Sequence, residues 1–217
     1  MFKKIFSFFI SIMKNYNNID LNNEIGYLEP NNKQGRIQFI ENFIKESKSK
    51  KIYDKLIETT PWEQGVYKMF GRDVKTPRLL WAMRDDKFNI KDSYTVTESS
   101  IWNKDIKKLK TKVEKIINKK IKYAQINYYR DGNDYIGWHT DSEVMKGDMI
   151  ASISIGATRK FQFRPINKNN DNKFEIELTN GSLIIFDENA AKLDWKHRIP
   201  KQPKIEEGRI NITFRLR

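Results

Sequence analysis

The second half of the chain is a succession of short β-rich segments that are separated by turn residues. Such segments lie at residues 124–129, 150–155, 160–164, 174–178 and 182–186. Asn, Asp and Gly, which favour turns, separate them at 131–133, 167–172 and 180–181. Many short strands without intervening helices are typical of a β-sandwich or barrel, so the pattern predicts a jelly roll over residues 121–217.

The last segment, residues 208–217, has the clearest alternation. One face of an extended strand there carries Ile210, Ile212, Phe214 and Leu216, and the other carries Arg209, Asn211, Thr213 and Arg215. Two guanidiniums, an amide and a hydroxyl are too polar for an ordinary core face. The row suits a barrel lining that binds a dicarboxylate through forked arginine contacts. The alternative is a solvent-facing row on a terminal strand.

Residues 36–120 predict helices and hairpins. Apolar residues recur at helical spacing from Ile37 through Ile44 and continue to Ile57, which predicts one or two helices that end before Pro61. A further helix is expected at 104–120, where lysines surround an apolar stripe of Ile106, Leu109, Val113, Ile116 and Ile117. Between these helices, residues 65–98 predict hairpins and loops. The fold class is therefore mainly β with flanking helices (α+β).

Residues 1–35 are expected to form a tail or linker. Lys3 and Lys4 precede an apolar stretch at 5–13, which superficially resembles a secretory signal. No small-x-small cleavage site follows that stretch, so a frayed terminal helix or a loosely docked tail is the preferred interpretation.

The charge of the chain narrows the choice of partner. Its 41 Lys and Arg against 28 Asp and Glu give a net charge of +13, and residues 1–120 hold 25 of the basic and 15 of the acidic side chains. Such an excess favours a polyanionic partner, nucleic acid first and an anionic membrane second. No apolar run approaches the roughly 20 residues of a membrane span, so we expect an intracellular, soluble protein of nuclear, cytoplasmic or viral compartment.

Cysteine is absent, which excludes disulfides, thiolate metal sites and a cysteine nucleophile. A metal would need histidine and carboxylate ligands, and the chain has only two histidines, His139 and His197. In an extended strand His139 and Asp141 point to the same side, and His197 follows 56 residues after Asp141. Two histidines and one carboxylate form the facial triad of non-haem Fe(II) oxygenases. The alternative is two structural histidines.

These motifs together resemble the AlkB-type Fe(II)/2-oxoglutarate-dependent dioxygenases, and most closely their duplex-DNA repair branch. The resemblance covers 125–217 in full and reaches back more loosely to about Tyr67. It rests on the residues at 127–132, 136–143, 150–159, 181–186, 195–200 and 209–215.

The resemblance implies a double-stranded β-helix with an N-terminal nucleotide-recognition lid. It implies Fe(II) on His139, Asp141 and His197, with 2-oxoglutarate and O2 as co-substrates. The implied 2-oxoglutarate contacts are Asn127, Tyr129, Arg209, Asn211, Thr213 and Arg215. The implied reaction is oxidative demethylation of N-alkylated bases in DNA, which releases succinate, CO2 and formaldehyde.

The resemblance also suggests substrate contacts. Phe70 stands where duplex-active relatives carry an apolar finger, although it could be an ordinary core aromatic. Arg78 could hold a phosphate, and Glu143 could meet the polar edge of the base or lie on the surface. Val96 stands where relatives stack the flipped base on an aromatic ring, so Trp81 or Tyr94 would have to compensate.

The implied domain plan is a tail at 1–35, helices and lid at 36–120, and a dioxygenase core at 121–217. The expected partner is nucleic acid, DNA before RNA, for a monomer without a stable protein partner or a membrane. Two other functions stay open. One is a 2-oxoglutarate oxygenase of RNA or of protein side chains, and the other is an inactive nucleic-acid-binding module.

Overall fold

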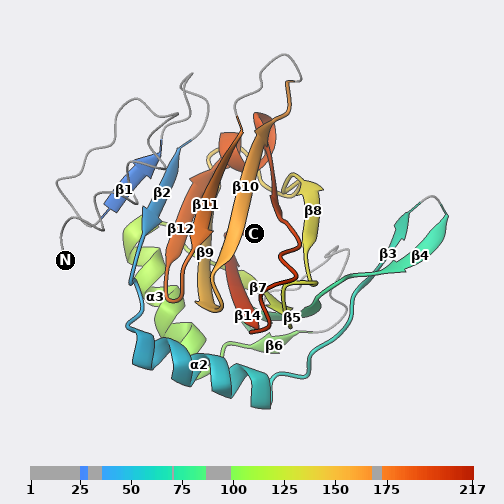
Figure 1. Cartoon of the computed structure of the whole chain (residues 1–217). Helices are drawn as coiled ribbons and strands as arrows, with labels where there is room; N and C mark the ends of the chain where they lie inside the picture. The colour runs from blue at the N-terminus through green and yellow to red at the C-terminus, as the bar shows by residue number, and fades with distance from the viewer. Residues whose placement is uncertain (1–24, 29–35, 70, 87–98, 168–172) are drawn as a thin grey trace, which may run out of the picture.

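Two β-sheets pack face to face in the computed structural model, which describes residues 25–28, 36–69, 71–86, 99–167 and 173–217 (Figure 1). The main sheet has eight strands in the order β1-β2-β12-β9-β14-β7-β5-β6, and the small sheet has four in the order β11-β10-β13-β8. The main-sheet strands are β1 (Ile25–Leu28), β2 (Ile37–Ile40), β12 (Leu183–Asp187), β9 (Met149–Gly156), β14 (Arg209–Arg215), β7 (Tyr123–Tyr129), β5 (Leu79–Arg84) and β6 (Ser100–Ile101). The small-sheet strands are β11 (Phe174–Leu178), β10 (Arg159–Pro165), β13 (Trp195–Ile199) and β8 (Ile136–His139). This arrangement confirms the predicted jelly roll.

Strand β14 lies inside the main sheet, between β9 and β7. Its seven residues are all buried, and the strand is antiparallel to both neighbours. Ile210, Ile212 and Phe214 belong to the apolar cluster on the helix side of the sheet. Strand alternation therefore turns Arg209 and the other polar residues toward the small sheet. The solvent-facing alternative is wrong, because β14 is a central strand.

Two helices cover the outer face of the main sheet, α2 (Glu46–Thr59) and α3 (Lys104–Ile117) (Figure 1). Helix α3 begins where predicted because Asn103 caps it: its side chain accepts hydrogen bonds from the backbone N–H groups of Asp105 and Ile106, at 3.1 and 2.9 Å. Most of the predicted stripe is buried, but Ile116 is 41% exposed. Among the described residues no helix is both long and apolar enough to cross a membrane.

The expected helix from Ile37 is wrong at its start. Residues Ile37–Ile40 form β2, which pairs with β12, and Ile37 lies opposite Phe186. Asn42 then takes a left-handed conformation (φ 53°), and helix α2 begins only at Glu46. Long-range strand pairing overrides the helical spacing of these apolar residues, since propensity and pattern are weak beside burial on a sheet.

The remaining elements before residue 120 are of two kinds. Strand β5 pairs with β7, so the main sheet crosses the domain boundary expected at residue 120. Strands β3 (Val66–Met69) and β4 (Arg72–Lys75) form a separate hairpin that extends away from both sheets (Figure 1). This hairpin lies in the segment expected to carry hairpins and loops.

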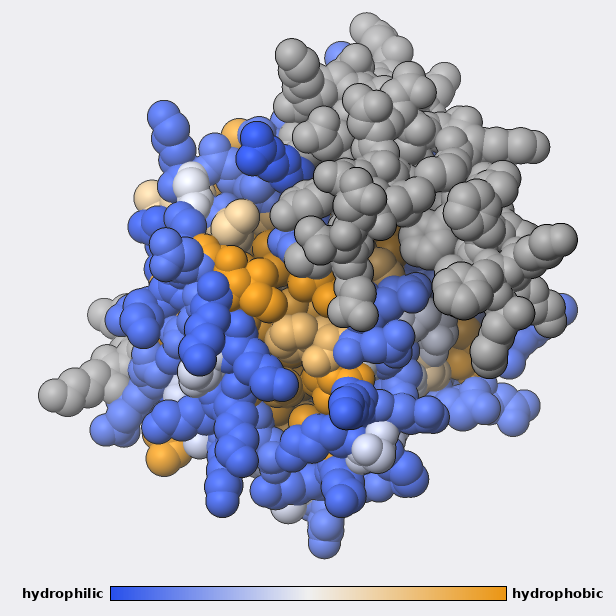
Figure 2. Space-filling model, turned by 90° about the vertical axis from the view of Figure 1, so that its left-hand side faces the viewer, coloured by the Kyte–Doolittle hydropathy of each residue, from blue (hydrophilic) through white to orange (hydrophobic). Residues whose placement is uncertain are grey.

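Hydrophilic residues form much of the face that Figure 2 shows, but apolar residues gather at its centre, with hydrophilic residues to the left of them and below them. The interior has two main apolar clusters. One lies between the helices and the main sheet, and the other lies between the two sheets, where it includes Phe161, Phe163 and Phe186.

Two loops close one end of the jelly roll by packing tightly on each other. The Gly132 N–H donates to the carbonyl of Ile205 at 2.7 Å, and the Gln202 N–H donates to the carbonyl of Gly132 at 2.7 Å. Gly132 is needed here for space, because a Cβ on it would lie 1.8 Å from the Gln202 carbonyl oxygen.

We therefore expect Gly132→Ala to destabilise the fold by about 1–3 kcal/mol, the usual cost of overpacking a filled site. Gly137→Ala is the matched control, because a Cβ at Gly137 would meet nothing within 4 Å. Urea unfolding of both variants measures the difference. Equal midpoints for the two variants would show that the loops can separate at little cost.

Candidate metal centre and adjoining pocket

The two histidines meet across a strand pair of the small sheet. His139 on β8 and His197 on β13 are direct partners in the antiparallel register, and their ring centroids are 4.3 Å apart. His197 is 3% exposed and packs among Phe161, Phe163 and Phe186, at centroid distances of 5.4, 5.8 and 5.6 Å. The structure thus brings together two residues that are far apart in the sequence.

Asp141 joins them from the loop after β8. Its backbone N–H donates to the carbonyl of Ala191 at 3.0 Å, in the short π-helix η2 (Asn189–Leu193). Asp141 Oδ2 lies 3.2 Å from His197 Nε2. One ligand atom from each of His139, Asp141 and His197 can be chosen so that all three lie within 4.8 Å of one another. A set this close can share one metal ion.

The electrostatics keep these side chains in the forms that bind a metal. The Nδ1 of His139 donates to the Gly137 carbonyl at 2.8 Å, which leaves Nε2 free as a ligand atom. Burial and the neighbouring His197 lower the pKa of His139 to about 4, so its imidazole is neutral at neutral pH. Burial raises the pKa of Asp141, but Arg215 and His197 outweigh it and hold this pKa well below its ordinary value.

Arg215 ties this cluster to the main sheet. Its Nη2 donates to Asp141 Oδ1 at 2.8 Å, and its Nη1 pairs with Glu143 Oε1. Arg215 is the last residue of β14, so the inward polar row of that strand begins at the metal ligands. Arg209, six residues earlier, stands at the other end of the row.

The row continues as a chain of buried polar contacts. Thr213 Oγ1 donates to Asn211 Oδ1 at 2.7 Å, and Asn127 Nδ2 donates to the same oxygen at 3.4 Å. Asn211 also donates to Ser152 Oγ, and Arg209 Nη2 donates to Ser154 Oγ at 2.8 Å. Tyr129, which is 3% exposed, also lies on this face. All six residues implied as 2-oxoglutarate contacts therefore lie on one face of the neighbouring strands β7 and β14.

Arg209 has unused hydrogen-bonding capacity. It is 1% exposed, and its Nε and Nη1 have no hydrogen-bond partner among the described residues. Burial lowers the pKa of Arg209 to about 10, which still leaves it charged at neutral pH. A buried guanidinium with unpaired N–H groups is costly unless an anion meets it. The residues present therefore fit both an Fe(II) ion and a carboxylate co-substrate.

The expected substrate contacts fare differently. Trp81 packs in the helix-side cluster at 5% exposure and donates from Nε1 to Ser100 Oγ at 3.1 Å, so it faces away from the metal ligands and cannot stack a base. Arg78 is 6% exposed, and its Nε donates to Asn127 Oδ1 at 2.8 Å. That burial argues against the phosphate contact expected for Arg78 and places its guanidinium beside the buried polar row.

Glu143 pairs with Arg215, which also pairs with the metal-ligand candidate Asp141, and the Glu143 side chain is 44% exposed. Phe70 and Tyr94 fall outside the described residues. Ser152 and Ser154 were not expected as site residues, although their alternation with isoleucines in 150–155 placed both on one strand face. Arg159 was not expected either, because it follows a turn and carries no pattern of its own.

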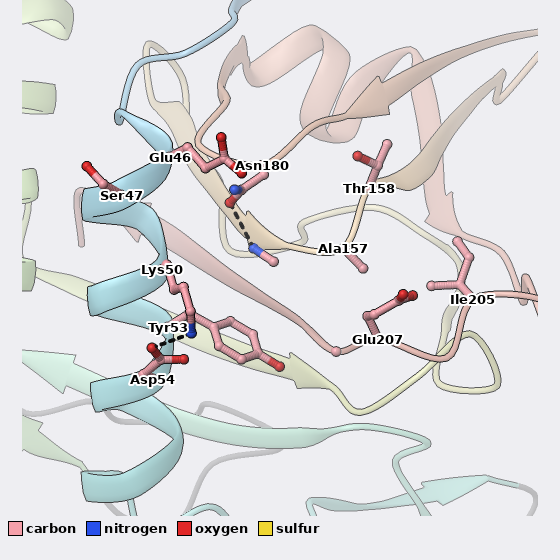
Figure 3. Close-up of a pocket in the computed structure, with 12 residues that line it drawn as sticks. Glu46, Ser47, Lys50, Tyr53, Asp54, Ala157, Thr158, Asn180, Ile205 and Glu207 are labelled. Atoms are coloured by element: carbon pink, nitrogen blue, oxygen red, sulfur yellow. Dashed lines mark hydrogen bonds and ion pairs between the residues drawn. The ribbon is translucent and has the colours of Figure 1, made fainter.

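A cleft of about 790 Å³ opens elsewhere, between α2 and the turns around Gly156 and Gly208 (Figure 3). Lys50 and Asp54 pair on its rim at 2.7 Å, and none of the three metal-ligand candidates lines it. Tyr53 packs against both glycines, and a Cβ on Gly156 would lie 2.4 Å from the Gly208 carbonyl oxygen. This contact fixes the residue before Arg209 and hence the start of β14.

We expect the protein to bind one Fe(II) per chain. His139→Ala should weaken that affinity by more than about 100-fold, because loss of a ligand should exceed the 10–100-fold cost of losing an outer contact. Calorimetric titration with Fe(II) under nitrogen measures both values. Thr140→Ala, between the two ligands, should bind like the wild type. Retained affinity in His139→Ala would remove this residue from the metal site.

Comparison with known proteins supports this arrangement. The model of the 2OG-Fe(II) oxygenase superfamily matches residues 36–215. The chain is 32% identical to the rat (Rattus norvegicus) "Alpha-ketoglutarate-dependent dioxygenase alkB homolog 3" over 173 residues, which cover 76% of this chain and 58% of that protein. It is 26% identical to the "DNA oxidative demethylase ALKBH2" of Arabidopsis thaliana over 206 residues, covering 82% of this chain and 65% of the relative.

A solved structure, "The structure of OsALKBH1", shares the fold with a TM-score of 0.60 at 16% identity, covering 89% of this chain and all of that one. The chain spans about three fifths of the length of the alkB homolog 3 relatives from rat and mouse. The family match covers nearly the whole described chain and includes all three metal-ligand candidates. This protein therefore belongs to the 2OG-Fe(II) oxygenase superfamily.

Proposed function

We propose that this protein removes methyl groups from the nitrogens of nucleic-acid bases by oxidation, with Fe(II), O2 and 2-oxoglutarate. The observation that carries the proposal is the cluster of His139, Asp141 and His197 joined by Arg215 to a buried row that ends in the unpaired N–H groups of Arg209. The relatives' names, which include a DNA oxidative demethylase, support the choice of substrate.

The reaction balances as follows. One oxygen atom of O2 enters a C–H bond of the N-methyl group, and the other enters the succinate that forms as 2-oxoglutarate loses CO2. The hydroxymethyl group then gives up its O–H proton and leaves as formaldehyde, and the electrons of the broken C–N bond stay on the base nitrogen. Bound Fe(II) supplies the oxygen chemistry; the protein supplies binding, orientation and exclusion of side reactions.

The metal-binding residues are prepared for this role by their neighbours. His139 and His197 offer imidazole nitrogens, and Arg215 holds the Asp141 carboxylate ionised and oriented. The phenylalanines around His197 exclude water on its side of the cluster. Co-substrate carboxylates would be met by Arg209, by the amides of Asn127 and Asn211, and by the hydroxyls of Tyr129 and Thr213.

The nucleic-acid substrate is favoured by charge. Hairpin β3–β4 extends from the body (Figure 1), and it exposes Lys68, Arg72 and Lys75. Phosphate contacts dominate the affinity of nucleic-acid-binding proteins, and a net charge of +13 suits such contacts. Glu143 pairs with Arg215 and is partly exposed, which supports the expectation that it accepts a hydrogen bond from a base that enters the site.

The decisive experiment incubates the protein with Fe(II), 2-oxoglutarate and oligonucleotides that carry N-methylated bases, as DNA, as RNA, and in single and double strands. We expect mass spectrometry to show demethylated DNA together with succinate and formaldehyde. His139→Ala should abolish all three products. Turnover on RNA or on a methylated peptide but not on DNA would replace this substrate assignment, and binding without succinate would indicate an inactive module.

We also expect Phe70→Ala to lower demethylation of duplex DNA at least about tenfold and to spare single strands. A base in a duplex must leave the stack, at a cost of a few kcal/mol, and an apolar side chain can fill its place. Initial rates on matched duplex and single-stranded oligonucleotides measure this. Tyr67→Ala, in β3 and 36% exposed, is the control. Equal losses on both substrates would make Phe70 a structural residue.

A further inference from the structure

A second buried arginine lies beside Tyr129, near the Arg209 end of the polar row. Arg159, the first residue of β10, is 1% exposed. Its guanidinium donates to four uncharged acceptors: the carbonyls of Asp131, Asp134 and Pro200 at 2.9, 2.9 and 2.8 Å, and the side-chain oxygen of Gln202 at 3.3 Å. Among the described residues Arg159 has no direct ion pair, although the carboxylates of Asp134 and Asp131 favour its charge through space. Arg159 therefore holds together the two loops that close this end of the jelly roll.

Arg159 also lies next to a pocket residue. Its guanidinium carbon is 5.6 Å from the centre of the Tyr129 ring, and that of Arg209 is 5.2 Å from the same centre. Tyr129 and Arg209 are direct partners in the β7–β14 register. One buried aromatic ring thus contacts both cations, at distances typical of cation–π interaction.

The result is a concentration of buried positive charge at one end of the polar row. Arg209 shows no ion pair among the described residues either, and Arg159 opposes its charge through space. Buried cations are costly without a counter-charge. Since Arg215 occupies the metal end of β14, the carboxylate of the co-substrate that lies farther from the metal is the anion that would reach Arg209.

We infer that Arg159 is a positioning residue for that remote carboxylate. It fixes Tyr129 beside Arg209 and adds a second positive charge behind the ring, so the pocket favours a dicarboxylic over a monocarboxylic 2-oxo acid. The inference rests on the proposed function in taking 2-oxoglutarate as the co-substrate.

The test compares two ligands that differ only at the remote end. Calorimetry on Fe(II)-loaded protein under nitrogen gives the dissociation constants of 2-oxoglutarate and of 2-oxobutyrate, which lacks the second carboxylate. We expect Arg159→Gln to raise the dissociation constant of 2-oxoglutarate about tenfold, which corresponds to about 1.4 kcal/mol. The dissociation constant of 2-oxobutyrate should rise less than about twofold. Arg159→Lys keeps the charge and should restore part of the affinity for 2-oxoglutarate.

Gln202→Leu is the matched control for loop anchoring. The Gln202 side chain accepts from Arg159 and from the backbone N–H of Lys160, so its loss loosens the same loops without removing charge. We expect this variant to lower the unfolding midpoint but to keep the ratio of the two dissociation constants. If Arg159→Gln fails to fold, the comparison of Arg159→Lys with Gln202→Leu still tests the inference, because only Arg159→Lys should change the ratio of the two dissociation constants.

The inference would be overturned if the Arg159 variants lost affinity for both ligands equally, or if Gln202→Leu changed the ratio of the dissociation constants in the same way. Arg159 would then be a structural residue. Failure of the proposed function looks different. In that case the wild-type protein itself would bind 2-oxoglutarate no better than 2-oxobutyrate, or would not bind it at all.

Discussion

The ion pair between Arg215 and Asp141 joins the main sheet to the loop that follows β8 of the small sheet. It connects the end of the central strand β14 with the loop that presents a metal ligand, at 2.8 Å and with both side chains buried. Removing one member of a buried pair leaves an uncompensated charge, which typically costs about 3–5 kcal/mol. The metal-binding loop and the main sheet therefore keep their relative position, and the polar row of β14 starts at a fixed distance from the metal ligands.

The residues that the sequence predicted well are those with a strict local pattern. Alternation over 209–215 placed four polar side chains on one face. The i, i+2 spacing of His139 and Asp141 predicted that both belong to one cluster, as they do, although Asp141 lies in the loop after β8 and not in an extended strand. The helix expected at 104–120 followed from its apolar stripe, and it forms over Lys104–Ile117. In each case the sequence pattern lies within a few residues, so contacts with distant parts of the chain do not override it.

The errors arose where long-range contacts decide. Ile37 and Ile40 look helical because apolar residues continue at 43 and 44, but pairing with β12 makes them a strand. Which face of β5 meets the pocket depends on its register with β7, which sends Trp81 to the helix side. Arg159 connects the loops at one end of the jelly roll by donating to the carbonyls of residues 131, 134 and 200. A local sequence pattern cannot predict contacts with the backbone of distant loops.

The register of β8 and β13 has a thermodynamic consequence. His139 and His197 face each other only when these strands, which residues 140–194 separate in the sequence, have paired. An unfolded chain offers a metal only the local pair His139 and Asp141. A metal ion thus binds the native state far more tightly than the denatured ensemble, and its presence raises the free energy of unfolding by mass action. A higher concentration of available iron in the surroundings of this protein would therefore raise the fraction of chains that are folded as well as the fraction that can turn over.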